Sequence, residues 1–163
     1  MLRSIATLGI LSILVLQVGC SGASSSTSTR NSFRESLGST SAAQLQKSLG
    51  DIVQRKYHYQ LERETYSPED IYVETRWQDD SALDDERAQG FSFARTRLII
   101  TARPRNRTPG MGATVSVTFR AECLLRGVAG DWIEAPMTAE RKKKLRVIYS
   151  ELKTEMTTGL RVI

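Results

Sequence analysis

The sequence predicts an α+β fold: a two-layer sandwich in which an antiparallel meander of 3–5 strands carries an N-terminal and a C-terminal helix packed on one face. Segments with alternating apolar residues, as strands require, occupy the middle of the chain, whereas apolar residues at helical spacing occur near both ends. No helical segment separates consecutive strands, so we expect them to pair antiparallel. The 163 residues provide for one ordinary domain, which we place at residues 33–163.

A first helix is predicted over residues 41–55. Ser41 and Gln44 have the spacing of a capping box at its start. Apolar side chains follow at helical spacing, at Leu45, Leu49, Ile52 and Val53.

Four strands and a short fifth are predicted from period-two alternation. They cover residues 57–62, 71–77, 91–103, 115–125 and 131–135. The strand at 115–125 alternates most regularly and directs Cys123 into the core. The opposite, wetter face of the sheet is expected to bring charged side chains together, namely Arg95, Arg97, Arg120, Glu122, Glu62 and Glu74.

A final helix is predicted over residues 139–157, after Pro136 and Thr138. Its apolar stripe consists of Leu145, Ile148, Tyr149, Leu152 and Met156. The acidic segment at 79–90 is predicted to be a solvated loop, because its acids lack the alternate spacing and turn glycine of a calcium site.

Residues 1–19 have the composition of a secretory signal peptide, with Arg3 before an apolar run and small residues at the end. The apolar run is shorter than the roughly 20 residues of a membrane-spanning helix, so a permanent span is the weaker interpretation. The residues up to Gly19 and Cys20 resemble the lipobox of bacterial lipoproteins, with Gln17 where that family usually has Leu. The resemblance implies that Cys20 is lipidated. An ordinary cleaved signal with an incidental cysteine is the alternative.

Residues 20–32 then form a Ser/Thr-rich segment typical of a tether. With the small helix-and-sheet domain, these features resemble envelope lipoproteins of Gram-negative bacteria, including the lipopolysaccharide-assembly lipoprotein and the accessory lipoproteins of the outer-membrane barrel-assembly machinery. The resemblance rests on roughly the first thirty residues, and beyond them it is architectural. It implies a membrane partner through the lipid on Cys20. It also implies an outer-membrane location facing the periplasm, because Ser21 stands where Asp would favour inner-membrane retention.

The residue types argue against catalysis and cofactor binding. Two cysteines and one histidine are too few for a zinc cluster or a disulfide framework. A Gly-x-Ser-x-Gly elbow and nucleotide-binding glycine motifs do not occur in the sequence. We therefore expect no enzyme, no cofactor and no bound metal.

Two basic groups are candidate contacts to an anionic partner in a chain of net charge +5. They are Arg95, Arg97, Arg103, Arg105 and Arg107, and Arg141, Lys142, Lys143 and Lys144. For an exported protein the partner would be an envelope protein or an anionic envelope polymer, not nucleic acid. The alternative is that both groups only solvate the surface. Trp77 and Trp132 either pack in the core or lie at an interface.

These observations favour a non-enzymatic, lipid-anchored protein that binds another envelope component as an adaptor or assembly accessory. A small-ligand or lipid carrier, with a cavity between sheet and helices, is the alternative function. An enzyme would need a cleft that brings together polar groups far apart in the sequence.

Overall fold

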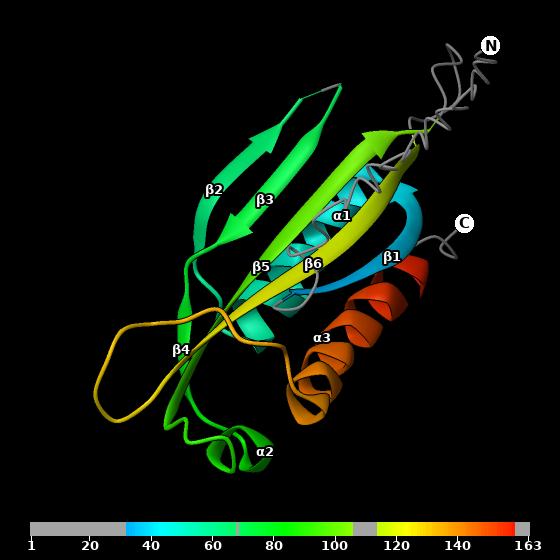
Figure 1. The fold of residues 1–163 in the computed structure, drawn as a ribbon. Coiled ribbons are helices and arrows are strands. Elements are labelled where there is room, and N and C mark those ends of the chain that lie inside the picture. Colours follow the sequence, from blue (N-terminus) through cyan, green and yellow to red (C-terminus); the bar gives the residue numbers. More distant parts are fainter. Residues whose placement is uncertain (1–31, 68, 106–113, 159–163) are drawn as a thin grey trace, which may run out of the picture.

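The computed structural model describes residues 32–67, 69–105 and 114–158. Within these ranges the chain forms helices and one six-stranded sheet of order β1-β6-β5-β3-β2, in which β4 also pairs with β5 (Figure 1). Every pair of neighbouring strands is antiparallel. The predicted α+β class with an antiparallel sheet is therefore confirmed. Our predictions for residues 1–19, for Cys20 and most of the 20–32 segment, and for Arg107 lie outside the described residues.

The element bounds differ from the predicted ones mainly in the first half of the domain. The strands are β1 (Ser32–Ser41), β2 (Leu61–Tyr66), β3 (Ile71–Thr75), β4 (Gln78–Ser81), β5 (Phe93–Pro104) and β6 (Thr114–Arg126). The helices are α1 (Ala42–Ser48), the π-helix η2 (Leu49–Lys56) that continues it, α2 (Asp84–Arg87) and α3 (Ala139–Thr158). Among the helices described, none is long and apolar enough to cross a membrane.

Strands β5 and β6 form the long central ribbon, as predicted. Their register runs without interruption from the pair Phe93 and Arg126 to the pair Pro104 and Val115. Because paired residues project to the same side of a sheet, the alternating buried residues of both strands share one face. That face carries Ala94, Thr96, Leu98, Ile100 and Ala102 from β5, and Val115, Val117, Phe119, Ala121, Cys123 and Leu125 from β6.

Strand β1 is absent from the sequence prediction. It pairs with β6 along the sheet edge, and only Phe33 and Leu37 among its residues are apolar and buried. The register shifts between Ser36 and Gly38, where Gly38 has a positive φ of 95°. An edge strand that is mostly polar and carries a bulge lacks the regular alternation on which the prediction depends.

The predicted start of the first helix is correct, because the Ser41 hydroxyl accepts a hydrogen bond from the Gln44 backbone N–H at 3.2 Å. The strand predicted over 57–62 is wrong for residues 57–60. The helix continues to Lys56, and His58 then adopts a positive φ of 58°. Tyr57 therefore caps the helix, Tyr59 lies in the connection after His58, and the strand begins only at Leu61.

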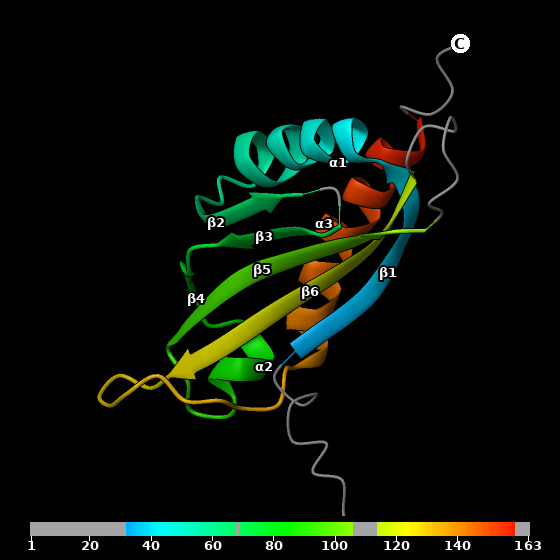
Figure 2. The same cartoon turned by 90° about the horizontal axis from the view of Figure 1, so that it is seen from above.

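Helix α3 supplies the C-terminal part of the core, as predicted. Its stripe residues Leu145, Ile148, Leu152 and Met156 are buried in the same cluster as Leu45 of α1, Val53 of η2 and the inner residues of β5 and β6. The rings of Phe33, Phe119 and Tyr149 meet edge to face, with centres 6.0–6.2 Å apart. Figure 2 shows α3 beside β1 and the end of α1, in agreement with the contacts between these elements.

Candidate functional site

The outer face of the sheet carries arginines and aromatic residues. Phe93, Arg95 and Arg97 share one face of β5, since residues two apart in a strand project to the same side. This face is opposite the core. Trp77 lies between β3 and β4, and Trp132 follows β6.

These side chains stack in an alternating series, which we call the arginine–aromatic ladder: Phe93, Arg126, Trp132, Arg95, Trp77 and Arg97. The Arg126 guanidinium carbon lies 4.9 Å from the ring centre of Phe93 and 4.6 Å from that of Trp132. The Arg95 guanidinium carbon lies 4.6 Å from the Trp132 ring centre and 4.9 Å from the Trp77 ring centre. Arg97 contacts Trp77 at 4.8 Å. These distances are those of cation–π contacts, so both tryptophans are held on the outer face.

The core-packing interpretation of Trp77 and Trp132 is therefore wrong: both are half-buried on the outer face rather than members of the core. Their sequence neighbours alone do not distinguish a core position from a stacked one, because the arginines that cover them come from other strands.

At one end of the ladder the charge is neutralised. Arg97 donates to Glu122 through Nε at 2.7 Å and to Glu74 through Nη1 at 2.5 Å. Arg120 pairs with Glu122 at 2.5 Å. Burial lowers the pKa of Arg97, but the hydrogen bond to Glu122 and the charges of both carboxylates raise it overall. The predicted grouping on the outer face is confirmed for Arg97, Arg120, Glu122 and Glu74. No ion pair among the described residues joins Glu62 to them, and, contrary to the prediction, Arg97 is not open to an anionic partner.

At the other end the charge is not neutralised. Among the described residues, neither Arg95 nor Arg126 forms an ion pair. The Nε atoms of both are buried without a hydrogen-bond partner. These two guanidiniums are thus oriented by aromatic rings, and their charge remains available to an anionic group.

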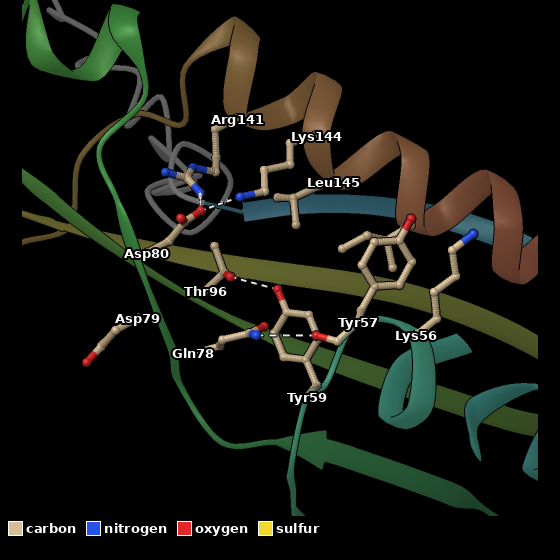
Figure 3. A pocket seen from close by; sticks show the side chains of 11 residues that line it. Lys56, Tyr57, Tyr59, Gln78, Asp79, Asp80, Thr96, Arg141, Lys144 and Leu145 are labelled. Atoms are coloured by element: carbon tan, nitrogen blue, oxygen red, sulfur yellow. Dashed lines mark hydrogen bonds and ion pairs between the residues drawn. The ribbon is translucent and has the colours of Figure 1, made fainter. Parts of the chain in front are cut away.

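A cavity of about 230 Å³ lies on the other side of the sheet, between η2, α3, β4 and β5 (Figure 3). The Tyr59 and Thr96 hydroxyls hydrogen-bond at 2.8 Å in its wall. Gln78 donates to the backbone oxygen of Tyr57 at 3.3 Å. Asp79, also in the lining, points away from the other labelled side chains. The cavity is smaller than the roughly 300 Å³ at which ligand pockets usually begin.

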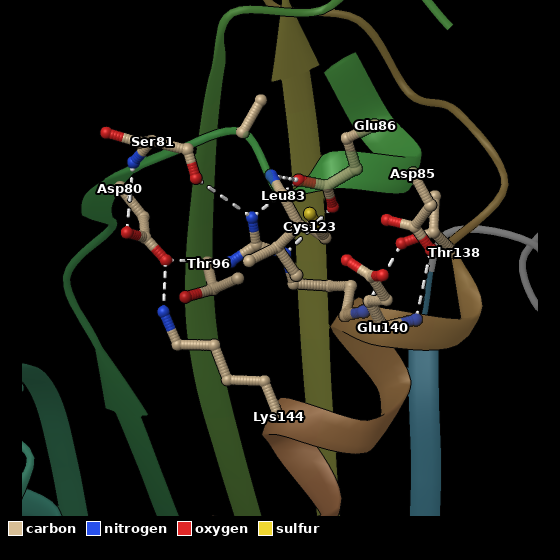
Figure 4. A network of polar contacts seen from close by, with 12 residues as sticks. Asp80, Ser81, Leu83, Asp85, Glu86, Thr96, Cys123, Thr138, Glu140 and Lys144 are labelled. Atoms are coloured by element: carbon tan, nitrogen blue, oxygen red, sulfur yellow. Dashed lines mark hydrogen bonds and ion pairs between the residues drawn. The ribbon is translucent and has the colours of Figure 1, made fainter. Parts of the chain in front are cut away.

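Arg141 is in the lining of this cavity (Figure 3), and its contacts contradict two predictions. Figure 4 shows Asp80 and Glu86, two acids of the polar network to which it belongs. Its side chain is 1% exposed, and it forms a bidentate pair with Glu86, also 1% exposed, at 2.9 and 2.6 Å. It also donates to Asp80 at 2.9 Å. The acidic segment 79–90 is therefore not a solvated loop: it forms β4 and α2, and two of its acids neutralise Arg141. Arg141 itself is not available to an outside anion.

The electrostatics of this network follow from burial and charge. Burial lowers the pKa of Arg141, but the hydrogen bond and charge of Glu86, together with Asp80, raise it well above its usual value. For Asp80, burial raises the pKa, but hydrogen bonds from Lys144 and Arg141 lower it overall. Glu86 also accepts a hydrogen bond from the Leu83 backbone N–H at 2.8 Å, which fixes the start of α2.

The remaining candidate residues are dispersed. Lys144 pairs with Asp80, while Lys142 and Lys143 are exposed on α3. Arg103 is exposed near the far end of β5, and Arg105 donates to the Ser39 hydroxyl at 3.1 Å. Of the predicted basic residues, the structure thus joins Arg95 and Arg97 in one ladder and Arg141 and Lys144 in one network.

Cys123 is buried in the core, as predicted. Burial raises the pKa of its thiol to about 12, so it is protonated at neutral pH and a poor nucleophile. In the part of the chain that the structure describes, no group of three or more His, Cys, Asp or Glu side chains is placed to hold a metal ion.

Sequence reasoning missed Arg126 and Phe93 at the ladder, and the role of Glu86 in the buried network. Arg126 could have been found, because it continues the outward phase of Arg120 and Glu122 along β6. Glu86 gives no such signal, since it lies 55 residues from Arg141 in the sequence. Comparison with protein-family models, curated proteins and solved structures gives no match for this chain.

Proposed function

We propose that this chain is a non-enzymatic lipoprotein, held by a lipid on Cys20 at the outer membrane and facing the periplasm. Its domain binds another envelope component as an adaptor or assembly accessory. The proposal for the anchor is supported by the lipobox-like residues that end at Cys20 and by the Ser/Thr-rich segment between them and β1.

The observation that carries the binding role is the open end of the arginine–aromatic ladder. Arg95 and Arg126 are oriented but have no carboxylate partner among the described residues, and Trp132 lies between them in the series of contacts. Tryptophan and arginine are the residues most enriched at the energetic centres of protein interfaces. The ladder therefore suits an acidic face of an envelope protein, or an anionic envelope polymer.

A small-ligand carrier is the second candidate, favoured by the cavity beside Tyr59 and Lys144. About 230 Å³ accommodates only a small polar molecule, and the space is too small for the acyl chains of a lipid. The lipid-carrier part of this alternative thus has little support.

The anchor is tested by replacing Cys20 with Ala and following the protein in membrane and soluble fractions. Lipidation on Cys20 predicts that the wild-type protein sediments with membranes and that the variant does not, because acyl chains supply the membrane affinity. Unchanged membrane association of Cys20→Ala contradicts the proposal.

The binding role is tested by chemical crosslinking of the wild-type protein in isolated envelopes, followed by purification and identification of the adducts. The proposal predicts a reproducible adduct that Arg95→Gln together with Arg126→Gln weakens, and that Lys142→Gln together with Lys143→Gln leaves unchanged. A turnover activity without a specific adduct contradicts it.

A further inference from the structure

The segment between β6 and α3 begins with an exposed apolar tip. Residues 127–130 are Gly, Val, Ala and Gly, so no charged or hydrogen-bonding side chain lies among them. The Val128 residue is 86% exposed, and nearby Ile133 and Phe93 are 48% and 41% exposed. Figure 1 shows this segment projecting from the end of the sheet, away from α3.

This tip gathers exposed apolar area that is otherwise scattered. Of the large apolar residues that are exposed in the described ranges, Val128, Ile133 and Phe93 lie at this end, while Tyr66 and Val147 lie elsewhere. The end of β6 places two of them, because Leu125 pairs with Ile133 and Arg126 pairs with Phe93, so Ile133 and Phe93 flank the tip on opposite sides of the sheet. An exposed apolar projection is typical of a surface that contacts a partner or a lipid bilayer.

The strand that follows the proposed anchor begins at the same end of the sheet as the tip. β1 begins at Ser32, which pairs with Glu122 near the end of β6, so the start of β1 and the tip lie at one end (Figure 2). Cys20 precedes Ser32 by twelve positions, which span at most roughly 40 Å when fully extended. A lipid on Cys20 therefore stays within that distance of Ser32, at the end of the sheet that carries the tip.

The charges at this end select the kind of surface. Among the described residues Arg95 and Arg126 have no paired carboxylate, but the segment after β6 carries two exposed acids, Asp131 and Glu134, so these four residues together have no net charge. Trp132 lies among them, with the amphipathic ring that suits the boundary between lipid headgroups and acyl chains. The absence of a net charge on these four residues, together with an apolar tip, favours a zwitterionic phospholipid surface over a strongly anionic one.

From these observations we infer that the tip formed by Val128, Ala129 and Ile133 docks on the zwitterionic phospholipid surface of the leaflet that carries the Cys20 lipid. The inference rests on the proposed lipid anchor. Docking orients the domain with the β5–β6 hairpin end, where Arg103 and Arg105 lie, away from the membrane.

The test uses the full lipidated protein with a single new cysteine, either Val128→Cys or the matched control Val147→Cys on α3. Each is labelled with an environment-sensitive fluorophore and reconstituted in phosphatidylcholine vesicles that contain headgroup-proximal spin-labelled lipid. The protein without a new cysteine serves as the labelling blank, since Cys123 is 3% exposed.

Docking predicts that the label at 128 shifts to shorter emission wavelength, is quenched by the spin-labelled lipid and is protected from aqueous iodide. The label at 147 stays open to iodide. Raising the salt concentration leaves the difference in iodide quenching between positions 128 and 147 unchanged, because Arg95, Arg126, Asp131 and Glu134 together carry no net charge. A label at 128 as open to iodide as the label at 147 overturns the inference, and so does protection that appears only after envelope proteins are added.

Intact mass separates this outcome from failure of the anchor. A protein that carries acyl chains on Cys20 but leaves position 128 in water contradicts only the docking inference. A protein whose mass shows no acyl chains contradicts the proposed anchor.

Discussion

Arg141 and Arg95 belong to two basic groups that look alike in the sequence, yet in the described part of the structure one is buried and ion-paired and the other is not ion-paired. Arg141 is 1% exposed and held by the carboxylates of Glu86 and Asp80. Arg95 lies between Trp77 and Trp132 on the outer face, and within the described ranges it forms no ion pair. Arg141 joins β4 and α2 to α3, so its charge stabilises the fold. Arg95 is held in position without being neutralised, so its charge can bind a partner.

The largest effect is expected at the neutralised site. Glu86→Gln leaves the buried Arg141 guanidinium with a weaker partner, and removing one partner of a buried pair typically destabilises by about 3–5 kcal/mol. Urea unfolding of wild type and variant measures the loss. Glu64→Gln on the exposed β2 edge is the control. A loss in Glu86→Gln as small as that of the control would mean that the buried pair does not hold these elements together.

A smaller loss is expected at the ladder. Trp132→Ala removes two cation–π contacts, which at partly exposed sites amount to about 1–2 kcal/mol together. Because Trp132 packs the segment after β6 against Arg95 and Arg126, backbone hydrogen exchange should accelerate over residues 127–138 in Trp132→Ala. Trp77→Ala also removes two cation–π contacts, but it leaves the contacts of Trp132 in place. Equal acceleration in both variants contradicts the role given to Trp132.

The pH dependence of stability separates the two sites further. The pKa of Asp80 is lowered in the folded protein, so its ion pairs contribute fully above the unfolded pKa of about 4 and are lost as pH falls through the folded value. Asp80→Asn should therefore lower the free energy of unfolding by a constant amount near neutral pH. Below about pH 4 the difference from wild type should shrink.

The control for this series is Asp79→Asn on the same strand, because Asp79 is exposed. Its free energy of unfolding should follow the wild-type pH profile. A difference between Asp80→Asn and wild type that persists unchanged into acid would show that the ion pairs of Asp80 are not its source.

The smallest effect is expected at Cys123, where the measured property is the reactivity of the thiol rather than the stability of the fold. Cys123 lies on the inner side of the sheet near Arg141, and burial raises the pKa of its thiol to about 12. Iodoacetamide at pH 8 should leave the folded chain unmodified at Cys123 and modify it in urea, as mass spectrometry of the peptides would show. Rapid labelling of Cys123 in the folded protein is the contrary result.

The elements that could be predicted from the sequence are those with a regular apolar periodicity. The strands β5 and β6 and the helix α3 have long, regular apolar patterns that tertiary contacts do not override. β1 was missed because an edge strand with one buried side needs few apolar residues, and Gly38 interrupts even those. The segment 57–60 was misassigned because its alternating tyrosines have the pattern of a strand, although Tyr57 caps the helix and His58 turns the chain with a positive φ.

The candidate site was predictable only in part. The grouping of Arg97 with Glu74 and Glu122 follows from strand phase, and the prediction was correct. The pair of Arg141 with Glu86 joins α3 to α2, and the stacking of Arg95 depends on two tryptophans from separate connections. Contacts of this kind are set by the three-dimensional arrangement of elements rather than by spacing along one of them.

The claim that the open ladder binds another envelope component is tested most directly by a photo-crosslinking amino acid placed in the chain in intact cells. p-Benzoylphenylalanine in place of Trp77 keeps an aromatic ring in the ladder, and the same residue in place of Lys143 samples the exposed basic turn of α3. The account predicts an adduct from position 77 and none from position 143. Adducts from position 143 alone, or none from position 77, would contradict it.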